Sequence, residues 1–180
     1  MVRLFYFYEM DLRETILAGH SKKQMDKIVK WIGQSQDRFD ELVKLFLGNE
    51  YRVTQRAAWP LSYCVIKHPS LVNKHFGKLI KNLKKEDLHD AIKRNTVRFL
   101  QHVEIPRRYH GEIMNICFDY VQSPTEAIAV KAFSLGILEK LLKIYPDIKQ
   151  ELKTIIEEQW EMETAAFRSR AKKILKAINA

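Results

Sequence analysis

The chain carries an internal repeat with spacings of 39, 36 and 39 residues, and this repeat constrains the fold more than any other feature. Each copy has an apolar anchor, a small residue four positions later and a leucine seven or eight positions after the anchor. The anchors are Val53, Ile92, Ile128 and Phe167, the small residues are Ala57, Thr96, Ala132 and Ala171, and the leucines are Leu61, Leu100, Leu135 and Leu175. Such a period is typical of stacked-helix solenoids, in which each unit buries its apolar face against its neighbours.

Helical periodicity runs through almost the whole chain, and alternating strand patterns are absent. We therefore predict an all-α, right-handed superhelix of about five antiparallel helix pairs. The pairs are 5–18 with 21–32, 36–47 with 50–67, 70–84 with 86–103, 106–121 with 124–144, and 146–161 with 164–178. Residues 1–180 form a single domain in this prediction, with an atypical N-terminal capping pair at 1–33 and four repeats at 36–178.

Local signals support these helix boundaries. Gly33 follows an apolar helical stretch, where a C-terminal cap is expected. The segment Ser123-Pro-Thr-Glu126 has the pattern of a capping box with proline at the first helical position, which predicts a helix that begins at 124. Pro60 falls inside a predicted helix, so we expect a kink there.

The predicted second helices resemble those of the HEAT family of armadillo-type helical repeats. Phe167-Arg168-Ser-Arg-Ala171 followed by Leu175 matches the family pattern best, and Val53 with Ala57 and Leu61 matches it nearly as well. The resemblance covers about residues 36–178, and it implies a binding scaffold that uses the concave surface lined by the second helices. The inter-helix aspartate of the family is missing from this chain.

Composition limits the class of protein. The chain has 180 residues, of which 46% are hydrophobic and 29% charged, and no apolar run approaches the roughly 20 residues that span a bilayer. The apolar segment at 4–8 is too short for a signal peptide and lacks a cleavage site. Cys64 and Cys117 have no paired spacing, which favours buried free thiols. We expect a cytoplasmic protein that does not bind a membrane.

A net charge of +9 favours an acidic partner. Arg56, Lys131 and Arg170 each stand three residues after an anchor, so they are predicted to form a row along the concave groove. In this interpretation the row binds phosphate or carboxylate groups, and further residues flank it or stack on a base: Arg52, Trp59, Tyr63, Arg98 and Lys173. The partner is then a protein or a nucleic acid. In the alternative interpretation the row is solvated or bonds to helix ends in the next repeat.

A second basic feature lies on a predicted first helix, where Lys74, Lys78, Lys81 and Lys85 form a stripe opposite an apolar face. Such stripes usually serve solubility. As a first helix, it is expected to face the convex side, away from the cationic row.

No motif in the chain indicates a cofactor or a catalytic metal. The six histidines and two cysteines lack metal-ligand spacing, and the six glycines form no phosphate-binding loop. The leading interpretation is therefore a non-enzymatic binding protein. The alternative is a DNA-acting enzyme similar to the HEAT-like alkylpurine DNA glycosylases, which use aromatic, basic and acidic residues. Against it, Trp59 is the one tryptophan placed on the concave face, and no acid is expected within a turn of it on that face.

Overall fold

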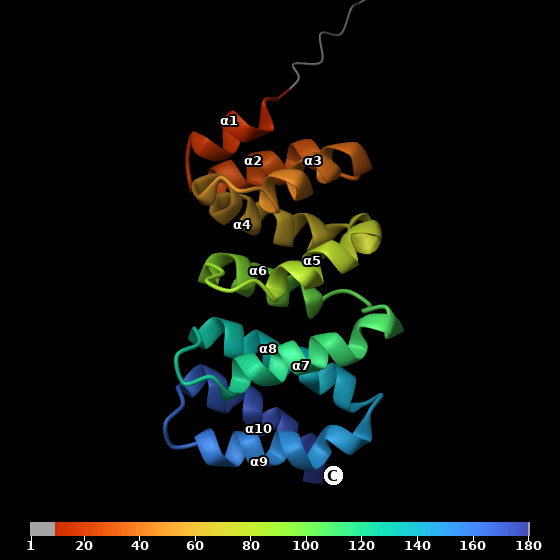
Figure 1. The fold of residues 1–180 in the computed structure, drawn as a ribbon, viewed down its shortest axis with the longest axis vertical. Coiled ribbons are helices and arrows are strands. Elements are labelled where there is room, and N and C mark those ends of the chain that lie inside the picture. The colour runs from red at the N-terminus through yellow and green to blue at the C-terminus, as the bar shows by residue number, and fades with distance from the viewer. Residues whose placement is uncertain (1–9, 180) are drawn as a thin grey trace, which may run out of the picture.

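The computed structural model describes residues 10–179, and within this part of the chain every regular element is helical (Figure 1). The prediction of an all-α fold is confirmed. The α-helices are α1 (Leu12–Leu17), α2 (Lys22–Ile32), α3 (Gln36–Phe46), α4 (Tyr51–Lys67), α5 (Phe76–Leu83), α6 (Asp90–Leu100), α7 (His110–Gln122), α8 (Ile128–Leu142), α9 (Lys149–Gln159) and α10 (Ala165–Asn179). Short 3₁₀ segments are η1 (Pro69–His75), η2 (Arg107–Tyr109) and η3 (Pro146–Ile148).

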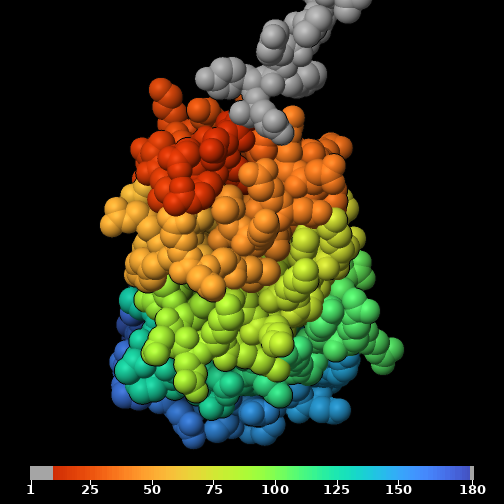
Figure 2. All heavy atoms as spheres, turned by 45° about the horizontal axis from the view of Figure 1, so that its top comes forward, coloured from red at the N-terminus to blue at the C-terminus, as the bar shows by residue number. Residues whose placement is uncertain are grey.

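The helices form successive pairs that stack in chain order. In Figure 1 the stack runs from α1 at the top to α9 and α10 at the bottom, with α7 and α9 nearer the viewer than α8 and α10. The second helices make one continuous row, because α4 packs against α6, α6 against α8, and α8 against α10. The space-filling view shows each coloured band in contact with the next (Figure 2). The division into a capping pair and four repeats, and the right-handed turn, stay predictions.

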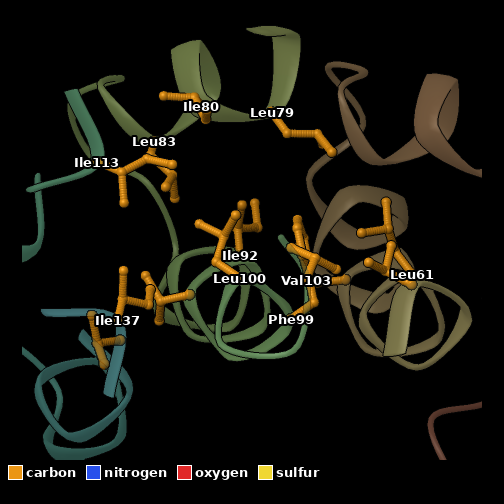
Figure 3. Close-up of a cluster of buried hydrophobic side chains, with 14 of the residues drawn as sticks. Leu61, Leu79, Ile80, Leu83, Ile92, Phe99, Leu100, Val103, Ile113 and Ile137 are labelled. Atoms are coloured by element: carbon orange, nitrogen blue, oxygen red, sulfur yellow. The ribbon is translucent and has the colours of Figure 1, made fainter. Parts of the chain in front are cut away.

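The core lies between the two rows of helices. Figure 3 shows Leu79, Ile80 and Leu83 of α5 above Ile92 and Leu100 of α6, and all five side chains are buried. α5 therefore covers the apolar side of α6, and the opposite side of α6 remains for other contacts.

The predicted repeat register is correct in three copies and fails at one anchor. Ala57, Thr96 and Ala171 are at most 1% exposed, and Ala132 is half-buried. The anchor Ile128, however, is 50% exposed. It is the first residue of α8, and α8 packs against α6, α7 and α10, so its apolar residues are not confined to one face. Spacing alone could not identify the buried positions of such a helix.

The capping box predicted at Ser123 is wrong. Ser123 ends α7 instead, where its backbone N–H donates to the carbonyl of Asp119, and α8 begins four residues later than predicted. The carboxylate of Glu126 turns inward to accept a hydrogen bond of 2.7 Å from Lys93 of α6. Its other oxygen accepts a hydrogen bond of 2.9 Å from the backbone N–H of Ala127, so the carboxylate does not return to Ser123 as a capping box requires.

Other helix ends are capped by polar side chains or by glycine. Asp11, Ser21 and Ser35 precede α1, α2 and α3, and their side chains accept hydrogen bonds from backbone N–H groups in the first turn. Gly33 ends α2 with a φ of 52°, a value that glycine adopts without strain. α4 is assigned as one helix through Pro60, which is buried. The predicted first helix 5–18 lies partly outside the described residues, and its described part is α1.

Candidate functional site: a pocket between the second helices

A pocket of about 410 Å³ opens between α4 and α6 on the second-helix row. It is formed by side chains from both helices and from the loop between α1 and α2. Its lining residues are His20, Gln55, Trp59, Tyr63, His89, Asp90, Ala91, Arg94, Asn95 and Arg98. Three of these residues, Trp59, Tyr63 and Arg98, were predicted to belong to a binding surface from the sequence.

Helical spacing places the key side chains of the pocket. Trp59 and Tyr63 are one turn apart on α4, and Arg94 and Arg98 are one turn apart on α6, so each pair lies on one face of its helix. The two helices pack against each other, which brings the aromatic pair opposite the arginine pair. The result is a pocket with aromatic and cationic walls.

Aromatic rings form one wall. The rings of Trp59 and Tyr63 meet edge to face, with centroids 6.5 Å apart. The ring of His20 also lies close to that of Trp59, with centroids 5.4 Å apart and a tilt of 57°. Both tyrosine and tryptophan are half-buried, so each ring keeps part of its surface in the pocket. Partly exposed rings held in this way can stack on a flat ligand.

The cationic wall contains two guanidinium groups, and of these Arg98 is hydrogen-bonded to a neighbouring side chain. Arg98 lies over the Tyr63 ring at 4.4 Å and donates a hydrogen bond of 2.8 Å to the Tyr63 hydroxyl. This hydrogen bond lowers the pKa of Tyr63, and the positive charge of Arg98 lowers it further. Arg94 is exposed and has no hydrogen bond or ion pair with the described residues. Its charge is therefore available to a ligand.

A buried amide supports the floor of the pocket. Asn95 is 4% exposed, and its side-chain nitrogen donates to the carbonyl of Ala91 at 2.8 Å. The Ser62 hydroxyl of α4 donates to the amide oxygen of Asn95 at 3.1 Å. Asn95 occupies the same repeat position as Arg56, Lys131 and Arg170, and it ties α6 to α4. Its satisfied hydrogen bonds make it a support for the pocket rather than a ligand-binding group.

The rim of the pocket consists of polar residues at the start of α6. Nδ1 of His89 accepts a hydrogen bond of 2.9 Å from the backbone N–H of Ala91. Nε2 of the same ring lies 3.1 Å from the side-chain amide nitrogen of Gln55 on α4. Asp90 lies beside them with a side chain that is 64% exposed. Asp90 therefore lines the same pocket as Trp59, but from the neighbouring helix.

The predicted cationic row has partners within the protein. Arg56 donates to the carbonyl of Leu17 at 2.7 Å. Lys131 is 4% exposed and forms a buried ion pair with Glu163. Arg170 contacts a carboxylate oxygen of Glu139 at 3.5 Å and the amide oxygen of Gln101 at 3.2 Å. These contacts match the alternative interpretation, in which the row bonds to neighbouring units, and they leave little charge free for a ligand.

The remaining predicted residues lie outside the pocket. Arg52 and Lys173 are exposed, and neither lines the pocket between α4 and α6. On the lysine stripe, Lys74 pairs with Asp40 and lines, with Lys78, a separate hollow of about 620 Å³. The structure therefore separates the stripe from the α4/α6 pocket.

A set of polar contacts links successive units and was missed at the sequence level. In each contact, a side chain from one helix binds a side chain at the start of a second helix. The bound residue lies at the N-cap of that helix or just before it. The four contacts are Arg13 with Glu50, Gln55 with His89, Lys93 with Glu126, and Lys131 with Glu163. We call this set the loop ladder. The spacings of its loop members, 39, 37 and 37 residues, were the available signal.

The described residues contain no cluster of histidine, cysteine and carboxylate side chains that could hold a metal ion. Burial raises the pKa of Cys64 and Cys117 to about 12, so neither thiol is a ready nucleophile. Among the helices in the described range, none has the length and apolar character needed to cross a membrane.

A family model described as a HEAT repeat domain matches residues 12–178. No curated protein and no solved structure matches the chain.

Proposed function

Since the chain belongs to the HEAT repeat family, we propose that it is a non-enzymatic binding scaffold whose second-helix row binds a polyanionic partner, with the α4/α6 pocket at the centre of contact. The observation that carries this proposal is the guanidinium of Arg94, which has no hydrogen bond or ion pair with the described residues and lines the same pocket as Arg98 and Trp59. A partner rich in phosphate or carboxylate groups supplies the charge that such a pocket lacks.

The charge distribution supports a polyanionic partner. The chain carries nine more basic than acidic residues, and residues 74–108 alone contain ten basic against four acidic residues. This segment includes α6 and its two pocket arginines. An excess of positive charge around a pocket raises the local concentration of anionic ligands and speeds their association.

Binding of labelled polyanions tests the proposal. We expect fluorescence anisotropy at low salt to detect binding of an oligonucleotide, of polyglutamate, or of both, with an affinity that falls as salt rises. For an oligonucleotide, replacing one phosphate-contacting arginine lowers the slope of log affinity against log salt by about one unit. Arg94→Ala is the first variant, because Arg94 has no hydrogen bond or ion pair with the described residues to lose.

Two controls make this test specific. Arg168→Ala removes a cation from α10, outside the pocket, and is expected to change affinity less than Arg94→Ala. A triple replacement of Lys74, Lys78 and Lys81 by alanine tests the lysine stripe. Absence of binding by every polyanion at low salt, or loss of binding in the stripe variant alone, contradicts the proposal.

One observation favours a second candidate function. Asp90 places an exposed carboxylate in the same pocket as Trp59. The alternative of a DNA glycosylase requires an acidic residue of this kind. In that case the purified protein releases alkylated bases from DNA, and Asp90→Asn abolishes the release without abolishing DNA binding. Binding without any base release favours the scaffold.

A further inference from the structure

We propose that the α4/α6 pocket takes an unstacked base of a single-stranded nucleic acid, while Arg94 and Arg98 contact the adjoining phosphate. This inference rests on the proposed function and names the chemical class of its partner. It follows from the combination of stacking surface, pocket size and charge at this one place in the stack.

Aromatic rings distinguish a nucleic acid from an acidic peptide. His20, Trp59 and Tyr63 offer ring surface within a single pocket, with neighbouring centroids 5.4 and 6.5 Å apart. Carboxylate side chains have no extended ring to stack on these residues, whereas every nucleobase has one. The aromatic wall is therefore of use to a nucleic acid and of little use to polyglutamate.

The size of the pocket favours a single base over a duplex. Its volume of about 410 Å³ is within the range of pockets that enclose small organic ligands. A base within a duplex is stacked on both faces, so it reaches such a pocket only after it leaves the helix, and this unstacking costs free energy. A single strand presents its bases without that cost.

The two arginines lie where the strand's backbone must pass. Their Cβ atoms, one helical turn apart on α6, are roughly 5–6 Å from each other, so both guanidiniums can approach one phosphate. Arg98 is already held over the Tyr63 ring, which keeps its charge beside the aromatic wall. A base stacked on Trp59 therefore has cations within reach of its own backbone.

The experiment compares strands with equal charge and different bases. A short labelled single strand, the same strand with abasic sites, its duplex and polyglutamate are titrated by anisotropy at matched ionic strength. We expect the strand with bases to bind about five- to a hundred-fold more tightly than the abasic strand, which corresponds to the stacking of one base. The duplex is expected to bind more weakly than the single strand.

Variants of Trp59 locate the effect. Trp59→Leu should weaken binding of the base-carrying strand by the same factor and leave the abasic strand unchanged, whereas Trp59→Phe, which keeps a ring, should retain most of the preference. Trp160→Leu is the matched control, because Trp160 lines a different hollow near α10. Circular dichroism and melting confirm that each variant is folded.

The outcomes separate this inference from the proposed function. Equal binding of the base-carrying and abasic strands, or an equal loss for both in Trp59→Leu, overturns the inference while polyanion binding stands. Failure of all four probes to bind at low salt overturns both. A preference for bases that Trp160→Leu removes and Trp59→Leu keeps also overturns the inference, because it places the stacking site at α10.

Discussion

At the scale of single residues, the buried ion pair between Lys131 and Glu163 ties α8 to the loop before α10. Both side chains are at least nine-tenths buried, and Gln159 adds a contact of 3.3 Å to the lysine. A charge in such a place depends on its partner, because removal of the partner leaves it unpaired in a medium of low polarity. Loss of either charge of this pair should therefore lower the stability of the stack.

Glu163→Gln should lower the free energy of unfolding by about 3–5 kcal/mol, because it leaves the Lys131 ammonium without its counter-charge. Chemical denaturation measures the change. Lys131→Met combined with Glu163→Gln should recover much of the loss, since neither charge then remains. Glu157→Gln is the control, because its pair with Lys153 is solvent-exposed and should change stability by less than about 1 kcal/mol. A loss no larger in Glu163→Gln than in Glu157→Gln would disprove this assignment.

Asp40 gives the stack a sensitivity to acid. Burial opposes ionisation of its carboxyl group, but hydrogen bonds from Lys74, Gln36 and His75 outweigh burial and lower the pKa from 3.8 to about 2. Because the pKa is lower in the folded state, the contribution to stability is complete above about pH 4 and is lost as the pH falls through about 2. Unfolding by urea as a function of pH should therefore show a larger loss in the wild type than in Asp40→Asn between these values. Parallel curves would contradict the prediction.

The residue scale is also where the sequence was least informative. The repeat pattern predicted the position of Lys131 but not its ion pair with Glu163. Glu163 lies 32 residues away, in a loop whose path depends on how two units pack. Trp59 and Tyr63 could be assigned to a binding surface because helical spacing places both on α4. Arg94 was missed because no other cation stands at its repeat position. Asp90 was missed because it reaches the pocket of Trp59 from a neighbouring helix.

At the scale of elements, the contact between α4 and its neighbours depends on small residues. Ala57 is fully buried where α4 meets the adjoining helices, as the four-residue spacing from Val53 predicted. Helix boundaries could be predicted where a local cap decides them, as at Gly33. They could not be predicted at Ser123, because Glu126 bonds to Lys93 of the preceding unit and to Ala127 instead of returning to Ser123.

Ala57→Leu should destabilise the protein by about 1–3 kcal/mol, because the larger side chain overpacks a contact without free space. Thermal or chemical unfolding measures the change. Ala177→Leu adds the same atoms at an exposed position of α10 and should shift stability by no more than about 0.5 kcal/mol. Similar melting temperatures for the wild type and Ala57→Leu would show that α4 tolerates a bulky residue there.

At the scale of the whole molecule, each pair of helices depends on its neighbours. α10 packs on α8 and α9, and Phe167 of α10 is fully buried between them and the core. In such an array, stability is nearly a sum of the stability of each unit and of the contacts between adjacent units. A destabilising substitution at the C-terminal end should therefore affect mainly the helices near that end.

Phe167→Ala removes about 3–5 kcal/mol of packing from the last pair. We expect hydrogen exchange to show faster exchange in α9 and α10, while α4 and α6 keep most of their protection. Met162→Ala is the control, because Met162 is 83% exposed in the loop before α10. A uniform loss of protection along the chain would mean that the stack unfolds as one cooperative unit.

The unequal packing of the two rows has a mechanical consequence. The second helices form an unbroken line of contacts from α4 to α10, whereas α5 and α7 pack less closely and leave a hollow of about 780 Å³ that Lys84 and Glu112 bridge at 2.5 Å. We expect the second-helix row to be stiff and the hollow between α5 and α7 to deform easily. A force on the two ends of the stack should then bend the molecule about the second-helix row. The hollow between α5 and α7 should widen or narrow before the α4/α6 pocket changes shape.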